Sequence, residues 1–161
     1  PAEKVQKLII DEDEVTDEPF GIEFQIKPIR DIEFELAVSI ILDSGSYVVS
    51  SSSEDNFYGH FEISINPSDH LILDHTVSES PNLIEEFDPI LKRNVKFVRV
   101  NTTFKQQLMV TSQKDFEDSG SVWFMLEPIC IPYNVGFSIS SDQGELKVAK
   151  TKTTISSDQI L

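Results

Sequence analysis

Residues 121–139 read SVWFMLEPICIPYNVGFSI and hold the only tryptophan and the only cysteine of the chain. Apolar side chains alternate with other residues on both sides of the Cys130 segment: Val122, Phe124 and Leu126 before it, and Tyr133, Val135, Phe137 and Ile139 after it. A period of two is typical of a strand with one buried and one exposed face. The stretch therefore predicts two core strands joined by a rigid corner between Pro128 and Pro132.

The same alternation recurs along most of the chain. Alternating runs occupy residues 22–26, 32–40, 47–49, 61–65, 71–77, 95–110 and 146–148, and turn-forming residues separate them. Short strands at this spacing are typical of two packed antiparallel sheets. The pattern predicts an all-β sandwich of roughly nine or ten strands, and Trp123 fits its core.

Three places interrupt the pattern. Pro28 should end the first run, because proline cannot donate to a sheet. Residues 83–93 do not alternate and contain Pro89, so we expect a loop with one helical turn there. A phase slip at Phe97 predicts a bulge in the long run over residues 95–110.

The length of 161 residues suits one domain that needs no disulfide or metal for stability. We expect an acidic N-terminal segment or edge strand over residues 1–19, the sandwich over residues 20–149, and a loose tail over residues 150–161. The chain begins at Pro1 and shows no signal-peptide pattern, so we expect that any targeting segment has been removed.

The charge balance restricts the classes of partner. The chain carries 28 acidic and 13 basic residues, for a formal charge of −15. Such a charge repels phosphate backbones and anionic lipids, so nucleic acid and membrane surfaces are not expected partners. No apolar run is long enough to insert into a membrane.

Residues that could carry catalysis or bind metals are few. The available bases are His60, His70 and His75, and residues five apart on one strand face opposite sides. We therefore expect no metal site, and without a glycine-rich phosphate loop we expect no cofactor. Acidic groups are interpreted as solvated faces; they are Glu33/Glu35, Glu85–Glu86 and Asp115/Glu117/Asp118.

Cys130 and two aromatic residues remain as candidates. Cys130 has no Lys, Arg or His close in sequence to lower its pKa, so it is either a small buried side chain or a redox thiol. Phe57 and Tyr58 end a serine-rich loop, where they either seal the core or contact a partner.

The corner resembles a known family. The run Val122–Tyr133 and the alternating residues 135–139 look like the end of the N-terminal periplasmic domain of bacterial thiol–disulfide interchange reductases (DsbD), in which a proline closely follows the second of two cysteines. Cys130 and Pro132 match that cysteine and its proline. Residues 55–59 are similar to the family's cap loop, whose aromatic residue shields the redox pair.

The resemblance implies an immunoglobulin-like sandwich in the periplasm that exchanges disulfides with a thioredoxin-like protein or a membrane reductase segment. This chain lacks the first cysteine, because Phe124, Met125 and Leu126 occupy its expected window. One thiol cannot cycle between a dithiol and a disulfide.

We therefore expect a non-enzymatic, extracytoplasmic interaction module whose partner contacts involve Phe57, Tyr58, Pro132 and Tyr133. Two alternatives stay open: a one-cysteine protein that forms mixed disulfides through Cys130, and a surface- or carbohydrate-binding sandwich.

Overall fold

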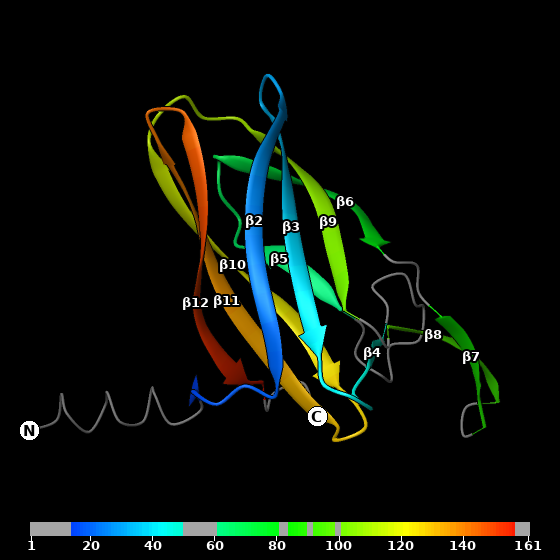
Figure 1. The fold of residues 1–161 in the computed structure, drawn as a ribbon. Coiled ribbons are helices and arrows are strands. Elements are labelled where there is room, and N and C mark those ends of the chain that lie inside the picture. Colours follow the sequence, from blue (N-terminus) through cyan, green and yellow to red (C-terminus); the bar gives the residue numbers. More distant parts are fainter. Residues whose placement is uncertain (1–13, 50–60, 81–83, 90–91, 99–100, 157–161) are drawn as a thin grey trace, which may run out of the picture.

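The computed structural model describes residues 14–49, 61–80, 84–89, 92–98 and 101–156, and this part of the chain forms strands and no helix (Figure 1). Its twelve strands are β1 (Glu14–Val15), β2 (Phe20–Arg30), β3 (Glu33–Leu42), β4 (Val48–Val49), β5 (Glu62–Ile65), β6 (Leu71–Ser80), β7 (Ile84–Asp88), β8 (Arg93–Val98), β9 (Thr102–Val110), β10 (Phe116–Leu126), β11 (Ile131–Asp142) and β12 (Glu145–Ile155). The prediction of an all-β antiparallel sandwich is confirmed. The described residues form more strands than the nine or ten estimated, because β1 and β7 have no alternating run and the run over residues 95–110 forms two strands, β8 and β9.

Two antiparallel sheets form the sandwich. One has the order β1-β12-β11-β10-β5, the other has the order β2-β3-β9-β6, and their inner faces share one hydrophobic core. A third sheet, β4-β8-β7, lies to one side of them (Figure 1).

The β10–β11 hairpin supplies much of the core, as its alternation predicts. The inward residues of both strands are buried: Val122, Phe124, Leu126, Tyr133, Val135, Phe137 and Ile139. Phe124 lies within 5.0 Å of Phe20 and 5.9 Å of Phe61, measured between ring centroids. Trp123 does not belong to this core, because it occupies an outward position of β10 and is half-buried there.

Pro28 does not end the first run. β2 continues through it to Arg30, and the register with β3 shifts only after Pro28. Proline is tolerated here because β2 is an edge strand, where a missing N–H need not break a ladder.

The segment from residue 83 to residue 110 differs most from its prediction. β7 and β8 form a hairpin, with Pro89 in the turn, where a loop with a helical turn was expected. The phase slip at Phe97 is not a bulge, because β8 and β9 are separate strands in different sheets.

The first and last of the described strands, β1 and β12, pair at one edge of the sandwich. β12 continues to Ile155 rather than ending near Val148, because β11 and β1 pair with its second half. Glu18 fixes this edge by accepting hydrogen bonds from Lys150 and from Thr153 Oγ1, the latter at 2.9 Å. Residues 150–155 are therefore strand and not loose tail, whereas residues 1–13 of the predicted N-terminal segment lie outside the described residues.

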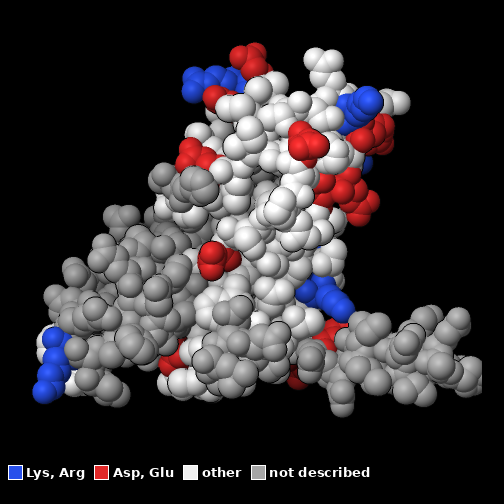
Figure 2. Space-filling model, turned by 180° about the vertical axis from the view of Figure 1, so that it is seen from behind, with Lys and Arg blue, Asp and Glu red and all other residues white. Residues whose placement is uncertain are grey.

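Charged side chains are scattered over the described part of one face of the molecule (Figure 2). On the face seen in Figure 2, the acidic groups lie in small clusters with basic side chains among them. Within the described ranges, no helix is long and apolar enough to cross a membrane.

Candidate functional site

The corner at Cys130 is a four-residue turn between β10 and β11. The ladder ends at the pair Leu126 and Ile131, which leaves residues 127–130 as the turn. Tyr47 anchors its first residue through two backbone hydrogen bonds: the N–H of Glu127 donates to Tyr47 O at 2.8 Å, and the N–H of Tyr47 donates to Glu127 O at 2.9 Å. The corner is therefore joined to a chain segment outside its own hairpin.

Backbone geometry directs the thiol. The Glu127–Pro128 peptide bond is cis, and Cys130 has a φ of 56°, in the left-handed region. That region costs a residue with a Cβ on the order of 1 kcal/mol, so it is occupied where the surrounding turn requires it. In this conformation Cys130 is exposed, and it is not the small buried side chain that its apolar neighbours favoured.

The thiol is paired with a carboxylate. Cys130 Sγ donates to Glu127 Oε2 at 3.3 Å, and Glu127 is a buried residue. The hydrogen bond to Glu127 raises the pKa of Cys130 above its ordinary value, and partial burial and the charge of Glu127 add to this. Burial also raises the pKa of Glu127, although the hydrogen bond from Cys130 opposes that shift.

These shifts limit the chemistry of the corner. Only the thiolate attacks disulfides and electrophiles, and its fraction at neutral pH falls as the thiol pKa rises. The raised pKa thus predicts that Cys130, although exposed, reacts slowly as a nucleophile at neutral pH. Because the chain has one cysteine, no resolving thiol is available within it.

The other predicted contact residues lie in different settings. Phe57, Tyr58 and His60 lie outside the described residues. Pro132 and Tyr133 are buried, and the Tyr133 ring packs 5.0 Å from that of Phe20, so neither side chain offers a surface to a partner. Burial and the nearby charge of Glu18 raise the pKa of Tyr133.

The corner nevertheless presents an apolar tip, which we define as Pro128, Ile129 and Cys130. All three residues are exposed, and 52% of the Ile129 surface remains accessible. Because Tyr47 anchors the turn, this aliphatic side chain is held at a fixed position on the surface, which makes the tip a candidate contact surface.

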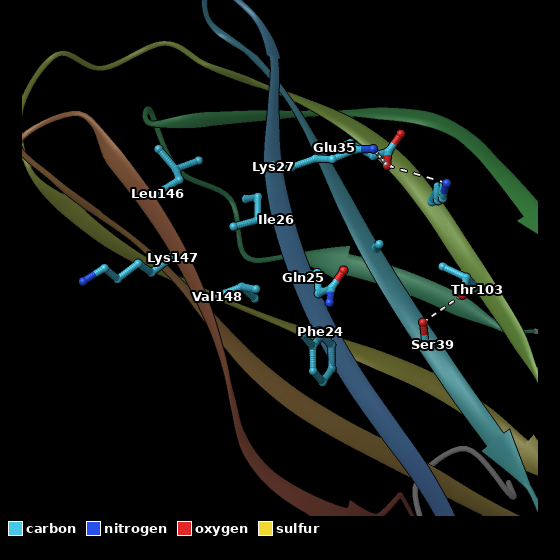
Figure 3. Close-up of a pocket in the computed structure, with 12 residues that line it drawn as sticks. Phe24, Gln25, Ile26, Lys27, Glu35, Ser39, Thr103, Leu146, Lys147 and Val148 are labelled. Carbon is cyan, nitrogen blue, oxygen red and sulfur yellow. Dashed lines mark hydrogen bonds and ion pairs between the residues drawn. The ribbon is translucent and has the colours of Figure 1, made fainter.

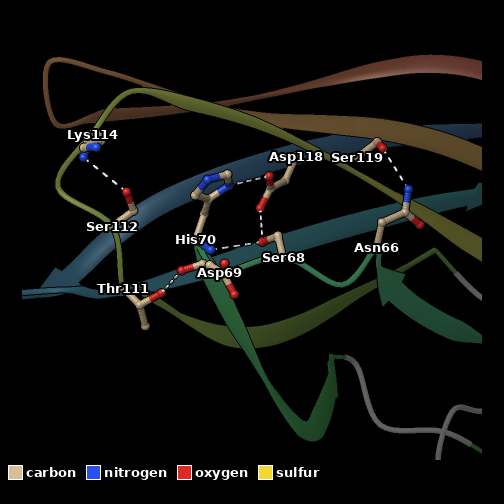
Figure 4. Close-up of polar contacts among 9 residues, drawn as sticks. All are labelled: Asn66, Ser68, Asp69, His70, Thr111, Ser112, Lys114, Asp118 and Ser119. Atoms are coloured by element: carbon tan, nitrogen blue, oxygen red, sulfur yellow. Dashed lines mark hydrogen bonds and ion pairs between the residues drawn. The ribbon is translucent and has the colours of Figure 1, made fainter.

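A second polar cluster lies between the two sheets. His70 Nδ1 lies 2.8 Å from Asp118 Oδ1, and Ser68 Oγ donates to Asp118 Oδ2 at 2.5 Å (Figure 4). The His70 ring stacks on Phe116 at 4.8 Å. Asp118 lies on β10, whereas Ser68 and His70 immediately precede β6, so the cluster connects the two sheets.

This cluster does not have the order of a catalytic triad. In a triad the imidazole lies between the hydroxyl and the carboxylate and accepts the hydroxyl proton. Here the carboxylate of Asp118 lies in the centre and bonds both partners. The arrangement holds the sheets together and leaves Ser68 without a base.

Two residues of the site, Glu127 and Asp118, were not predicted from the sequence. Glu127 lies three residues before Cys130, and a tight turn between them was the available signal for their pairing. Asp118 was interpreted as solvated, yet it is 8% exposed. Its burial could have been predicted from the sequence, because every second residue back from Phe124 lies on the inner face of β10, and Asp118 is one of them.

Within the residues that the structure describes, no group of three or more His, Cys, Asp or Glu side chains could hold a metal ion. In comparisons with known proteins, no family model, no curated protein and no solved structure matches this chain.

A substitution at Glu127 tests the thiol–carboxylate pair. We expect Glu127→Gln to accelerate maleimide labelling of Cys130 at pH 7 by several-fold, because removing the carboxylate lowers the thiol pKa and increases the thiolate fraction.

The raised pKa of Cys130 also predicts how the stability of the fold depends on pH. The folded form favours the neutral thiol, so the contribution of Cys130 to stability is present below its unfolded pKa and is lost as the pH rises through its folded pKa.

The matched control is Glu117→Gln, which removes an exposed carboxylate from the same strand, β10. Labelling rates are measured between pH 6 and pH 10. Equal rates in the wild type and in Glu127→Gln would show that the pair does not control the thiol.

Proposed function

We propose that this chain is a non-enzymatic, extracytoplasmic interaction module of immunoglobulin-like type, which contacts a protein partner through the apolar tip at Cys130. The observation that carries the proposal is the exposure of Ile129, at 52%, on a turn that Tyr47 anchors from a separate segment. A side chain held in place before binding loses little entropy on binding.

The chemistry of the corner supports binding over catalysis. The thiol pKa is raised, and Glu127, whose carboxylate is bonded to the thiol, is itself buried. The resemblance to the DsbD N-terminal domain adds an expected partner class, a thioredoxin-like protein or a membrane reductase segment. In such a pairing the corner would keep the contact surface of a redox domain without its dithiol.

The exposure of Cys130 favours one alternative function, which is one-cysteine exchange. In that reaction the Cys130 thiolate attacks a partner disulfide, a mixed disulfide forms, and the other partner sulfur leaves as a thiolate. The raised pKa predicts that this reaction is slow at neutral pH.

Photo-crosslinking at defined positions tests the proposal. Benzoylphenylalanine replaces Ile129 in one variant and Ile41, an equally aliphatic residue that is 42% exposed on β3, in the control. In cells of the source organism, we expect a discrete adduct from position 129 and none from position 41. A thioredoxin-like or reductase partner, identified by mass spectrometry, would support the resemblance.

The outcomes separate the hypotheses. No adduct from position 129, or the same adducts from both positions, would overturn the interaction surface. An adduct that forms equally well in the Cys130→Ser background, with reducing agent present, excludes the one-cysteine alternative. An adduct that requires Cys130 and is lost on reduction favours that alternative instead.

A further inference from the structure

β2 has a free backbone edge. It is the terminal strand of its sheet and pairs only with β3 within the described part of the chain. Pro28 lies opposite Phe34 in that ladder, and proline has no N–H, so this must be a pair whose backbone groups point away from β3. The register is constant from Phe20 to Pro28, so the N–H and C=O groups of Phe24 and Ile26 also point to the free edge.

A groove of about 650 Å³ adjoins this edge. Its lining includes four consecutive residues of β2, Phe24–Lys27, and three consecutive residues of β12, Leu146–Val148. Lining by consecutive residues means that the groove reaches the strand edges and not just one face. Figure 1 shows the two strands close together in the lower half of the sandwich and diverging toward its upper end.

One side of the groove is apolar. Phe24, Ile26, Leu146 and Val148 are partly buried and pack against the core. Figure 3 shows Ile26 pointing from β2 toward β12, and Leu146 and Val148 pointing back toward β2, whereas Lys147 points away. An apolar side chain that entered between the strands would meet aliphatic surface.

The other side of the groove has an unbalanced positive charge. On the outer face of the sheet, Glu35 Oε1 lies 3.5 Å from Lys27 Nζ and 3.9 Å from Lys105 Nζ (Figure 3). One carboxylate is thus shared by two ammonium groups, and the Lys27 side chain is 64% exposed. The charged residues that line the groove are Lys27, Lys105, Lys147 and Glu35, so its lining carries a net positive charge in a chain with a charge of −15.

We propose that the groove binds an extended segment of a partner protein in which acidic and apolar residues alternate, and that this segment adds to β2 as a further strand. Its backbone pairs with the free groups of Phe24 and Ile26. Alternate side chains then point to opposite faces, so the apolar set lies against Ile26 and Leu146, and the acidic set lies beside Lys27 on the outer face.

The charge of the edge selects this occupant over a second copy of the chain. Pairing between two β2 strands would bring the Lys27 side chains of both copies to the same edge, where like charges repel. An acidic segment instead supplies further negative charge to Lys27 and Lys105, which both lie near the carboxylate of Glu35. The groove has no residue in common with the Cys130 corner, so this proposal does not depend on the function proposed above.

Titration of the ¹⁵N-labelled full chain with a synthetic peptide tests the proposal. The probe is a capped hexapeptide of alternating Val and Glu. Two comparison peptides have Lys in place of Glu, or N-methyl groups on alternate residues so that one backbone edge lacks donors. At low salt, we expect saturable shifts of the Phe24 and Ile26 amides with the first peptide, and much weaker binding of the other two.

Variants locate the charge contact. We expect Lys27→Glu to weaken binding about fivefold or more. Lys152→Glu makes the same charge change on β12 outside the groove and should alter binding less than about twofold. Equal weakening by both variants, amide shifts confined to other strands, or equal binding of the N-methylated peptide would each overturn the proposal. The N-methyl comparison leaves the protein unchanged, so it holds even if a variant folds poorly.

Discussion

Replacing Phe124 with alanine should lower the free energy of unfolding by about 3–5 kcal/mol, the range for deleting a large ring from a packed core. Phe124 is fully buried. Its ring lies against three other aromatic rings, those of Phe20, Phe61 and Tyr133. Those rings come from different strands or from the segment before β5, so they cannot close the cavity by a small local movement. Urea denaturation followed by fluorescence measures the change.

Met125→Ala is the matched control for this substitution. Met125 adjoins Phe124 on β10 but points outward and is half-buried, so we expect a loss below about 1 kcal/mol. A domain of ordinary stability has about 5–15 kcal/mol in total, and Phe124→Leu provides a milder test if the alanine variant is largely unfolded. Similar losses at positions 124 and 125 would contradict the assignment of the inner face.

Replacing Gly120 with alanine should destabilise the sandwich by about 1–3 kcal/mol, although only one methyl group is added. A Cβ at this position would lie 2.5 Å from Ser64 O and 2.6 Å from Phe137 Cζ. The first atom is backbone of β5, and the second belongs to a buried ring, so neither can move freely. β5 pairs with β10 over only four residues, and we expect it to be displaced.

Gly136→Ala provides the comparison for Gly120→Ala. The added Cβ would lie 2.5 Å from Thr151 Oγ1, which is a side-chain atom of an exposed residue and can rotate away. We therefore expect a smaller loss at position 136, measured by the same urea titration. A loss at Gly136 equal to that at Gly120 would show that backbone proximity is not what makes Gly120 necessary.

The elements that could be predicted from the sequence are those in which alternation is long and uninterrupted. The inner faces of β10 and β11 follow directly from the period-two pattern, because a strand must bury one side. The prediction that Pro28 ends the first strand was wrong, because a proline ends a strand only where its nitrogen faces a neighbouring strand. β8 and β9 were predicted as one run for a related reason. Which sheet a strand joins depends on strands that are distant in the sequence.

The candidate site was predicted in part. Cys130 was identified, and its lack of a cationic neighbour agrees with the raised direction of its pKa. Its exposure could not be predicted from apolar neighbours, because the left-handed φ of Cys130 turns the side chain outward. The bond to Glu127 depends on that same turn.

The two ends of β10 have a mechanical consequence for any partner that pulls on the corner. At one end Asp118 bonds His70 and Ser68 from the loop that joins β5 to β6, and at the other end Glu127 is bonded to Tyr47. Along its length β10 pairs with β11 on one side and β5 on the other. A force on the apolar tip along the strand direction would pull β10 and β11 together, so it would load the β10–β5 and β11–β12 ladders in shear rather than peel a single strand away.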